Sequence, residues 1–278
     1  MSIEITNTIT VYEIIAIATA VFIPLFQMII KRFVFRPKLN YFANEFASLY
    51  YNAGGSQICI CGVFEISHQP AVVRKVELTI EDTEGNLLSS MDWAYVVSPE
   101  IHQNVQNTIA VSNTQVTTRV HPIKIQPNEI TNADLYFLDN CIEPQMQKEL
   151  RSLWELACEK HAKYPDNFTD AQNEFINSPI FSEAKHNFEK SFLWRTGVYT
   201  ATMITKYKRK ELQCKYKFEV SKYDSMRLER SIEILLMWYL QNAYQMPTGI
   251  CDIVPVKMSF VEKKTKQIHK KRNIGTFA

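Results

Sequence analysis

One apolar segment near the start of the chain constrains the fold more than any other feature. From Ile9 to Ile30 the sequence reads ITVYEIIAIATAVFIPLFQMII, and Glu13 is its one charged residue. About 20 apolar residues are enough for a helix to cross the hydrocarbon core of a bilayer. We therefore predict a transmembrane helix over residues 9–31, preceded by a short extracytoplasmic tail over residues 1–8.

The charges around this segment predict its orientation. No Lys or Arg precedes Tyr12, which is unlike a secretory signal peptide. Basic residues follow the segment instead, in a juxtamembrane linker over residues 32–38, and basic flanks stay in the cytoplasm. Six scattered cysteines fit the same reducing compartment. We therefore predict a single-pass protein of the bacterial inner membrane with its N-terminus outside. The basic flank consists of Lys31, Arg32, Arg36 and Lys38.

Three residues interrupt the apolar pattern of the predicted span, namely Glu13, Pro24 and Gln27. Pro24 removes a backbone donor and predicts a kink, while the amide of Gln27 favours a partner on another helix. Two readings follow. The helix is either a passive tilted anchor, or it self-associates through Glu13, Gln27 and the small residues Ala16, Thr19 and Ala20.

The chain as a whole has the composition of a globular protein, because 46% of its residues are hydrophobic and 22% are charged. Short runs of β-favouring residues separated by turn signals predict an antiparallel sandwich of immunoglobulin type over residues 39–262. The expected strands are 39–51, 57–67, 72–81, 87–97, 105–111, 115–125, 133–138, 198–206, 212–220 and 251–261.

Helical periodicity interrupts these strands twice. A helical insertion is expected over residues 143–190, with a break at Pro179, and a helix over 224–244 follows the capping signal of Ser221 and Asp224. Residues 263–278 read as a basic tail. The predicted fold class is thus a membrane-anchored α+β protein, with one N-terminal transmembrane helix and an immunoglobulin-like sandwich elaborated by helices.

Two motifs carry a resemblance to known proteins. The stop Lys31-Arg-Phe-Val-Phe-Arg-Pro37 and the segment Trp194-Arg-Thr-Gly-Val-Tyr199, with its Lys-rich hairpin, resemble a family of uncharacterised bacterial membrane-anchored proteins with an immunoglobulin-like cytoplasmic domain. The resemblance implies architecture and no catalytic residue. By analogy, some single-span bacterial proteins with β-rich cytoplasmic domains are effectors or partners in anti-phage defence.

Motifs for catalysis or cofactor binding are absent from the sequence. It contains no GxxxxGK[ST], GxGxxG, HExxH or GxSxG pattern, so no cofactor or metal is expected. Cys59 and Cys61 share one face of a strand and read as buried thiols. The nearest approach to a metal or hydrolase site is Glu159, His161, Asp166 and His186.

Two basic patches stand out against a net charge of only +2. Each is either a solvated edge or terminus, or a surface that contacts anionic membrane lipid at about 1 kcal/mol per cation. Nucleic acid is not expected as a direct ligand, because the aromatic and glycine pattern of an RNA-binding sheet is missing. The patches comprise Lys206, Lys208, Arg209 and Lys210, and then Lys263, Lys264, Lys266, Lys270, Lys271 and Arg272.

These features predict a non-enzymatic effector or interaction protein that binds a protein partner or forms homo-oligomers at the inner membrane, in a role such as anti-phage defence. The alternatives are a passive membrane-tethered scaffold or binding module, and a cryptic hydrolase around His161 and His186.

Overall fold

Antiparallel strands form a closed ring in the computed structural model, which describes residues 11–33, 36–52, 55–97, 122–139 and 143–267. The sheet order is β4-β6-β2-β1-β9-β8-β7-β3, and a ladder between β3 and β4 closes it into an eight-stranded barrel. The short strand β5 extends the sheet beside the start of β3. The strands are β1 (Lys38–Asn52), β2 (Gly55–Ser67), β3 (Ala71–Glu81), β4 (Leu87–Val97), β5 (Ile123–Ile125), β6 (Ile130–Leu138), β7 (Gly197–Tyr207), β8 (Lys210–Val220) and β9 (Ile253–Gln267).

Alternating side chains fill the barrel, as a two-residue period requires. In β8 the buried positions run from Leu212 to Val220 at every second residue. They belong to the same buried core as the large side chains of Phe64 on β2 and Phe137 on β6, which are fully buried. The interior is therefore a packed apolar core over most of its length.

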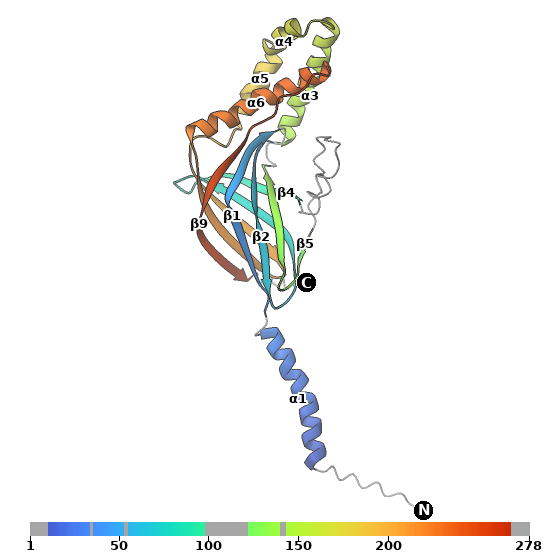
Figure 1. Cartoon of the computed structure of the whole chain (residues 1–278), viewed down its shortest axis with the longest axis vertical. Helices are drawn as coiled ribbons and strands as arrows, with labels where there is room; N and C mark the ends of the chain where they lie inside the picture. Colours follow the sequence, from blue (N-terminus) through green and yellow to red (C-terminus); the bar gives the residue numbers. More distant parts are fainter. Residues whose placement is uncertain (1–10, 34–35, 53–54, 98–121, 140–142, 268–278) are drawn as a thin grey trace, which may run out of the picture.

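Four helices gather at one end of the barrel and form a cap (Figure 1). They are α3 (Glu143–Lys163), α4 (Phe168–Ile176), α5 (Pro179–Lys190) and α6 (Lys222–Ala243). Pro179 begins α5 directly after its N-cap Ser178, and Ser221 caps α6. The fully buried indole of Trp194 donates to the carbonyl of Tyr50 at 3.3 Å, which ties the segment after α5 to the end of β1.

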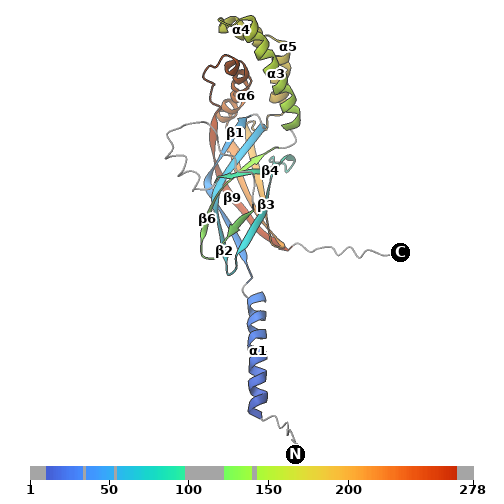
Figure 2. The ribbon, with the colours of Figure 1, turned by 90° about the vertical axis from the view of Figure 1, so that its right-hand side faces the viewer.

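Helix α1 (Val11–Phe33) lies at the opposite end of the barrel from the cap (Figures 1 and 2). The prediction of a helix here is confirmed, but the prediction that it crosses a membrane is overturned. Among the residues that the structure describes, no helix combines the length and apolarity that a crossing needs.

The predicted single-pass topology and inner-membrane location were inferred from the same segment, so the same finding overturns them. The immunoglobulin-like sandwich is also wrong. A sandwich consists of two separate sheets packed face to face. Here the ladders β3–β4 and β1–β9 join the strands into one closed sheet, so its two ends are paired.

Most of the remaining expected elements match observed ones within a few residues. The strand predicted over 105–111 lies outside the described residues, as does 115–121, and only 123–125 of the second segment is observed, as β5. Strand β9 continues to Gln267 and so includes the first part of the predicted basic tail.

Candidate functional site

Helix α1 holds the residues that were predicted to lie in the membrane. Pro24 lies inside a continuous helix, and the side chains of Pro24 and Gln27 are exposed. Glu13, Lys31 and Arg32 also belong to α1, but their side chains lie outside the described ones.

The described part of α1 exposes apolar side chains on every side. Each residue advances about 100° around a helix, so consecutive positions point in different directions. A helix that is apolar all round is typical of a buried helix. The large exposed side chains, with 46–71% of their surface accessible, are Val21, Phe22, Ile23, Leu25, Phe26, Met28 and Ile29.

A hollow of about 470 Å³ lies along one side of this helix. Phe22 and Phe26 bound it, and Ala18, Thr19 and Gln27 contribute to its lining. Small residues between large ones leave a hole into which a side chain from another helix fits.

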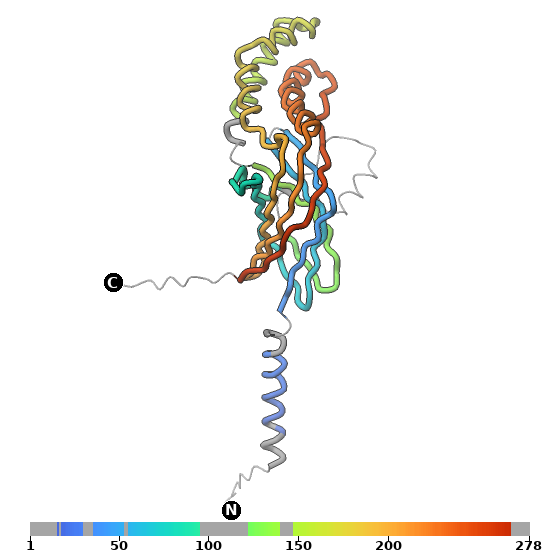
Figure 3. The backbone as a smooth tube through the Cα atoms, turned by 90° about the vertical axis from the view of Figure 1, so that its left-hand side faces the viewer, coloured from blue at the N-terminus to red at the C-terminus, as the bar shows by residue number. Residues whose placement is uncertain are grey.

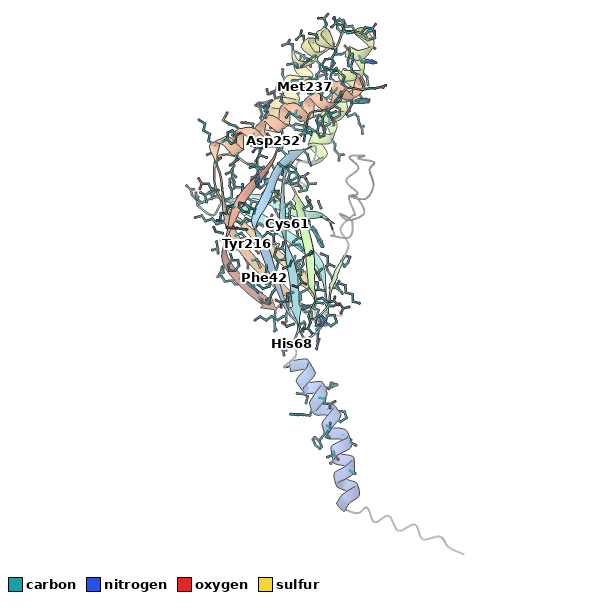
Figure 4. The ribbon with its side chains drawn as sticks, viewed as in Figure 1. Phe42, Cys61, His68, Tyr216, Met237 and Asp252 are labelled. Carbon is teal, nitrogen blue, oxygen red and sulfur yellow. The ribbon has the colours of Figure 1, made fainter. Side chains whose placement is uncertain are left out.

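The basic residues predicted as separate groups converge at the end of the barrel nearest α1. Arg36 precedes β1 and Lys38 begins it. Because the strands are antiparallel, these two residues lie at the same end of the barrel as the β7–β8 turn and the end of β9. Figure 3 shows these chain segments at the end of the barrel that faces α1, and His68, labelled in Figure 4, lies at the same end. We call this surface the basic end. It consists of Arg36, Lys38, Lys208, Arg209, Lys210, Lys264 and Lys266.

Two contacts hold the β7–β8 turn at the basic end. The ammonium group of Lys210 donates to the carbonyl of Pro37 at 3.1 Å, and that of Lys208 donates to Oε1 of Gln69 at 3.4 Å. Burial, together with the charges of Arg36 and Lys208, holds the pKa of Lys210 below its ordinary value. The cations of Arg36, Lys208 and Lys210 are therefore close enough to repel one another.

Some cations near this end are already neutralised. Lys206 pairs with Glu77 at 2.8 Å, and Lys264 pairs with Glu262 at 2.6 Å. These pairs are partly exposed and contribute little to stability. Lys270, Lys271 and Arg272 lie outside the described residues.

A cavity of about 1000 Å³ lies between the cap and the barrel. Sequence reasoning did not find it, because its walls come from α3, α5, β4, β7 and the segments that follow β6 and α5, and no local pattern joins them. Glu149 on α3 accepts from the side-chain amide of Asn187 on α5 at 2.7 Å, and Ser89 donates to Asp139 at 3.0 Å. Its charged lining residues are Asp139, Lys148, Glu149, Glu183, Lys190 and Arg195.

The residues of the predicted metal or hydrolase site and of the cysteine pair lie within the described part of the chain. Among the described residues no group of three His, Cys, Asp or Glu side chains could hold a metal ion. His161 packs edge-on against Tyr244 at 4.6 Å. The thiols of Cys59 and Cys61 lie 3.6 Å apart, and the hydrogen bond between them together with burial raises the pKa of Cys59, which keeps that thiol protonated.

The fold and these surfaces define a capped antiparallel barrel with an exposed apolar helix. Comparisons of the chain with protein-family models, with curated proteins and with solved structures find no match. The resemblance to uncharacterised bacterial membrane-anchored proteins therefore stays a prediction.

Proposed function

We propose that this protein is a non-enzymatic interaction protein that assembles with copies of itself through helix α1. The exposure of apolar side chains around α1 is the observation that carries the proposal. Each such side chain is worth about 1.5–3 kcal/mol when fully buried, and these are roughly half exposed, so covering one contributes about 1 kcal/mol.

A second copy of α1 is the partner that these features favour. Two helices that cover half of each other's seven large apolar side chains gain on the order of 7 kcal/mol, which is comparable to the cost of association of about 4–15 kcal/mol. A bundle of more than two copies covers more of each helix, so it is favoured over a dimer.

Gln27 also favours copies of the same helix. Its exposed amide both donates and accepts, so it can pair with the same amide of a copy across a symmetry axis. It borders the hollow beside Ala18 and Thr19, where a side chain from the neighbouring helix would fit.

The test compares the mass in solution of the full chain with that of Phe22→Ser/Phe26→Ser, by sedimentation velocity. We expect an oligomer for the full chain and a single-chain mass for the double variant. The control, Leu87→Ser/Ile130→Ser, removes two exposed apolar side chains from the barrel and should keep the oligomer. An unchanged oligomer in Phe22→Ser/Phe26→Ser would overturn the proposal.

A further inference from the structure

The barrel is closed between β1 and β9 over only part of its length. The ladder between them runs from Phe46 paired with Lys257 to Tyr50 paired with Ile253. Towards the basic end, residues 38–43 of β1 pair with β2 and residues 258–267 of β9 pair with β8. Within the described residues, the facing edges of these two segments share no ladder. We call this opening the seam.

Irregular pairing on both sides explains why the strands part. The register of β1 against β2 shifts between Ala43 and Ala47, and the register of β8 against β9 shifts between Lys215 and Tyr216. Such bulges bend a strand and increase its local twist. The edge of β9 beyond Lys257 therefore presents backbone donors and acceptors that no other described strand pairs with.

The side chains along the seam are aromatic and cationic. Phe42 and Phe260 are 53% and 60% exposed, and Lys263 bridges the seam, with its ammonium group 5.8 Å from the Phe42 ring and hydrogen-bonded to Asn40. Figure 4 labels Phe42 and Tyr216, both in this half of the barrel. Tyr216 packs against Phe260 across the β8–β9 pair.

Charge decides which strand fits this edge. Residues 263–266 of β9 carry Lys263, Lys264 and Lys266, and Glu262 is already paired with Lys264. Pairing with the same edge of a second copy would bring lysines together, which disfavours a homotypic contact. An acidic strand meets no such repulsion.

We propose that the seam is a docking site for an extended acidic segment of a partner protein, which adds as a strand to the free edge of β9. Main-chain hydrogen bonds to β9 hold the segment, Phe42 and Phe260 contact its apolar side chains, and Lys263 and Lys266 pair with its carboxylates. This site is independent of assembly through α1.

Fluorescence anisotropy tests the proposal with the full chain and a labelled short peptide of alternating Glu and Val. We expect this peptide to bind at least about tenfold more tightly than a Lys and Val peptide, because the charges are complementary. The acidic peptide methylated on every backbone nitrogen should lose at least about tenfold in affinity, because neither of its edges can then donate main-chain hydrogen bonds to β9.

Variants separate the seam from a general attraction of charge. Lys263→Glu/Lys266→Glu should weaken binding by about tenfold or more, whereas Lys148→Glu/Lys190→Glu makes the same charge change at the cap and should leave binding unchanged. Circular dichroism checks that both variants are folded.

Four outcomes would overturn the proposal. The first three are that the acidic peptide does not bind, that its methylated form binds equally well, and that the two lysine variants weaken binding equally. The fourth is that anionic lipid vesicles or a single-stranded oligonucleotide bind more strongly than the peptide and need Lys263 and Lys266 to do so. The last outcome would assign the surface to lipid or nucleic acid.

Discussion

Tyr41 and Gly62 are in such close contact across the β1–β2 pair that only a glycine fits. The hydroxyl of Tyr41 lies 2.6 Å, and the carbonyl oxygen of Phe42 2.5 Å, from the position that a Cβ on residue 62 would take. The hydroxyl is fixed because it donates to the carbonyl of Ile60 at 3.0 Å.

Gly62→Ala should therefore lower the free energy of unfolding by about 1–3 kcal/mol, as overpacking does. Gly197→Ala is the matched control, because a Cβ there meets nothing within 4 Å. Urea unfolding measures both. Equal stabilities of the two variants would contradict the packing described for Tyr41.

Tyr51 joins the barrel to the cap. Its hydroxyl donates to the carbonyl of Phe188 in α5 at 3.2 Å, and burial raises the pKa of this hydroxyl. Tyr51→Phe should lower the free energy of unfolding by about 1 kcal/mol, because the variant loses the contacts of this hydroxyl with the Phe188 carbonyl and, at 3.3 Å, with the Ser191 hydroxyl. The control Tyr223→Phe alters a 71% exposed residue and should change stability by less than about 0.5 kcal/mol. A Tyr51→Phe variant as stable as this control would show that the contact contributes nothing.

The cap should lose helix at acid pH partly through Glu174. Hydrogen bonds from Lys163 and Tyr164 lower the pKa of Glu174 to about 2. A carboxyl with a lowered pKa stabilises the folded state fully above its ordinary value of about 4.5, and this contribution is lost as pH falls towards 2. The measurement is the helical circular dichroism signal as a function of pH. We expect the Glu174→Gln variant to lack the loss of signal that this carboxyl causes as pH falls towards 2, and the control Glu183→Gln to keep it. Identical curves for Glu174→Gln and the unsubstituted chain would contradict the assignment.

Local patterns in the sequence predicted local structure well. The alternation from Leu212 to Val220 identified β8, and the capping signal at Ser221 is confirmed by a hydrogen bond from the backbone of Asp224 to its hydroxyl at 3.1 Å. The end of β9 was missed because residues 263–267 are exposed lysines and polar residues with no alternation.

Contacts between distant segments of the chain could not be predicted from the sequence. Whether a set of strands forms a sandwich or a barrel depends on which strands pair, and the ladder of Leu49 with Val254 joins residues far apart in the chain. The apolar run predicted the helix α1 but not its surroundings. Likewise, each basic segment was recognisable alone, whereas the meeting of Arg36, Lys208 and Lys266 at one end depends on strand direction.

Assembly through α1 is tested most directly by replacing Gln27 with residues of opposite charge in two separate variants. We expect Gln27→Glu and Gln27→Lys each to give a smaller assembly by sedimentation velocity, because copies of one variant place like charges together at the contact. Mixed in equal amounts, the two variants should regain the mass of the unsubstituted oligomer, since opposite charges then meet. If each variant alone assembles as the unsubstituted chain does, or if mixing restores nothing, Gln27 does not face its own copy and the account of α1 is wrong.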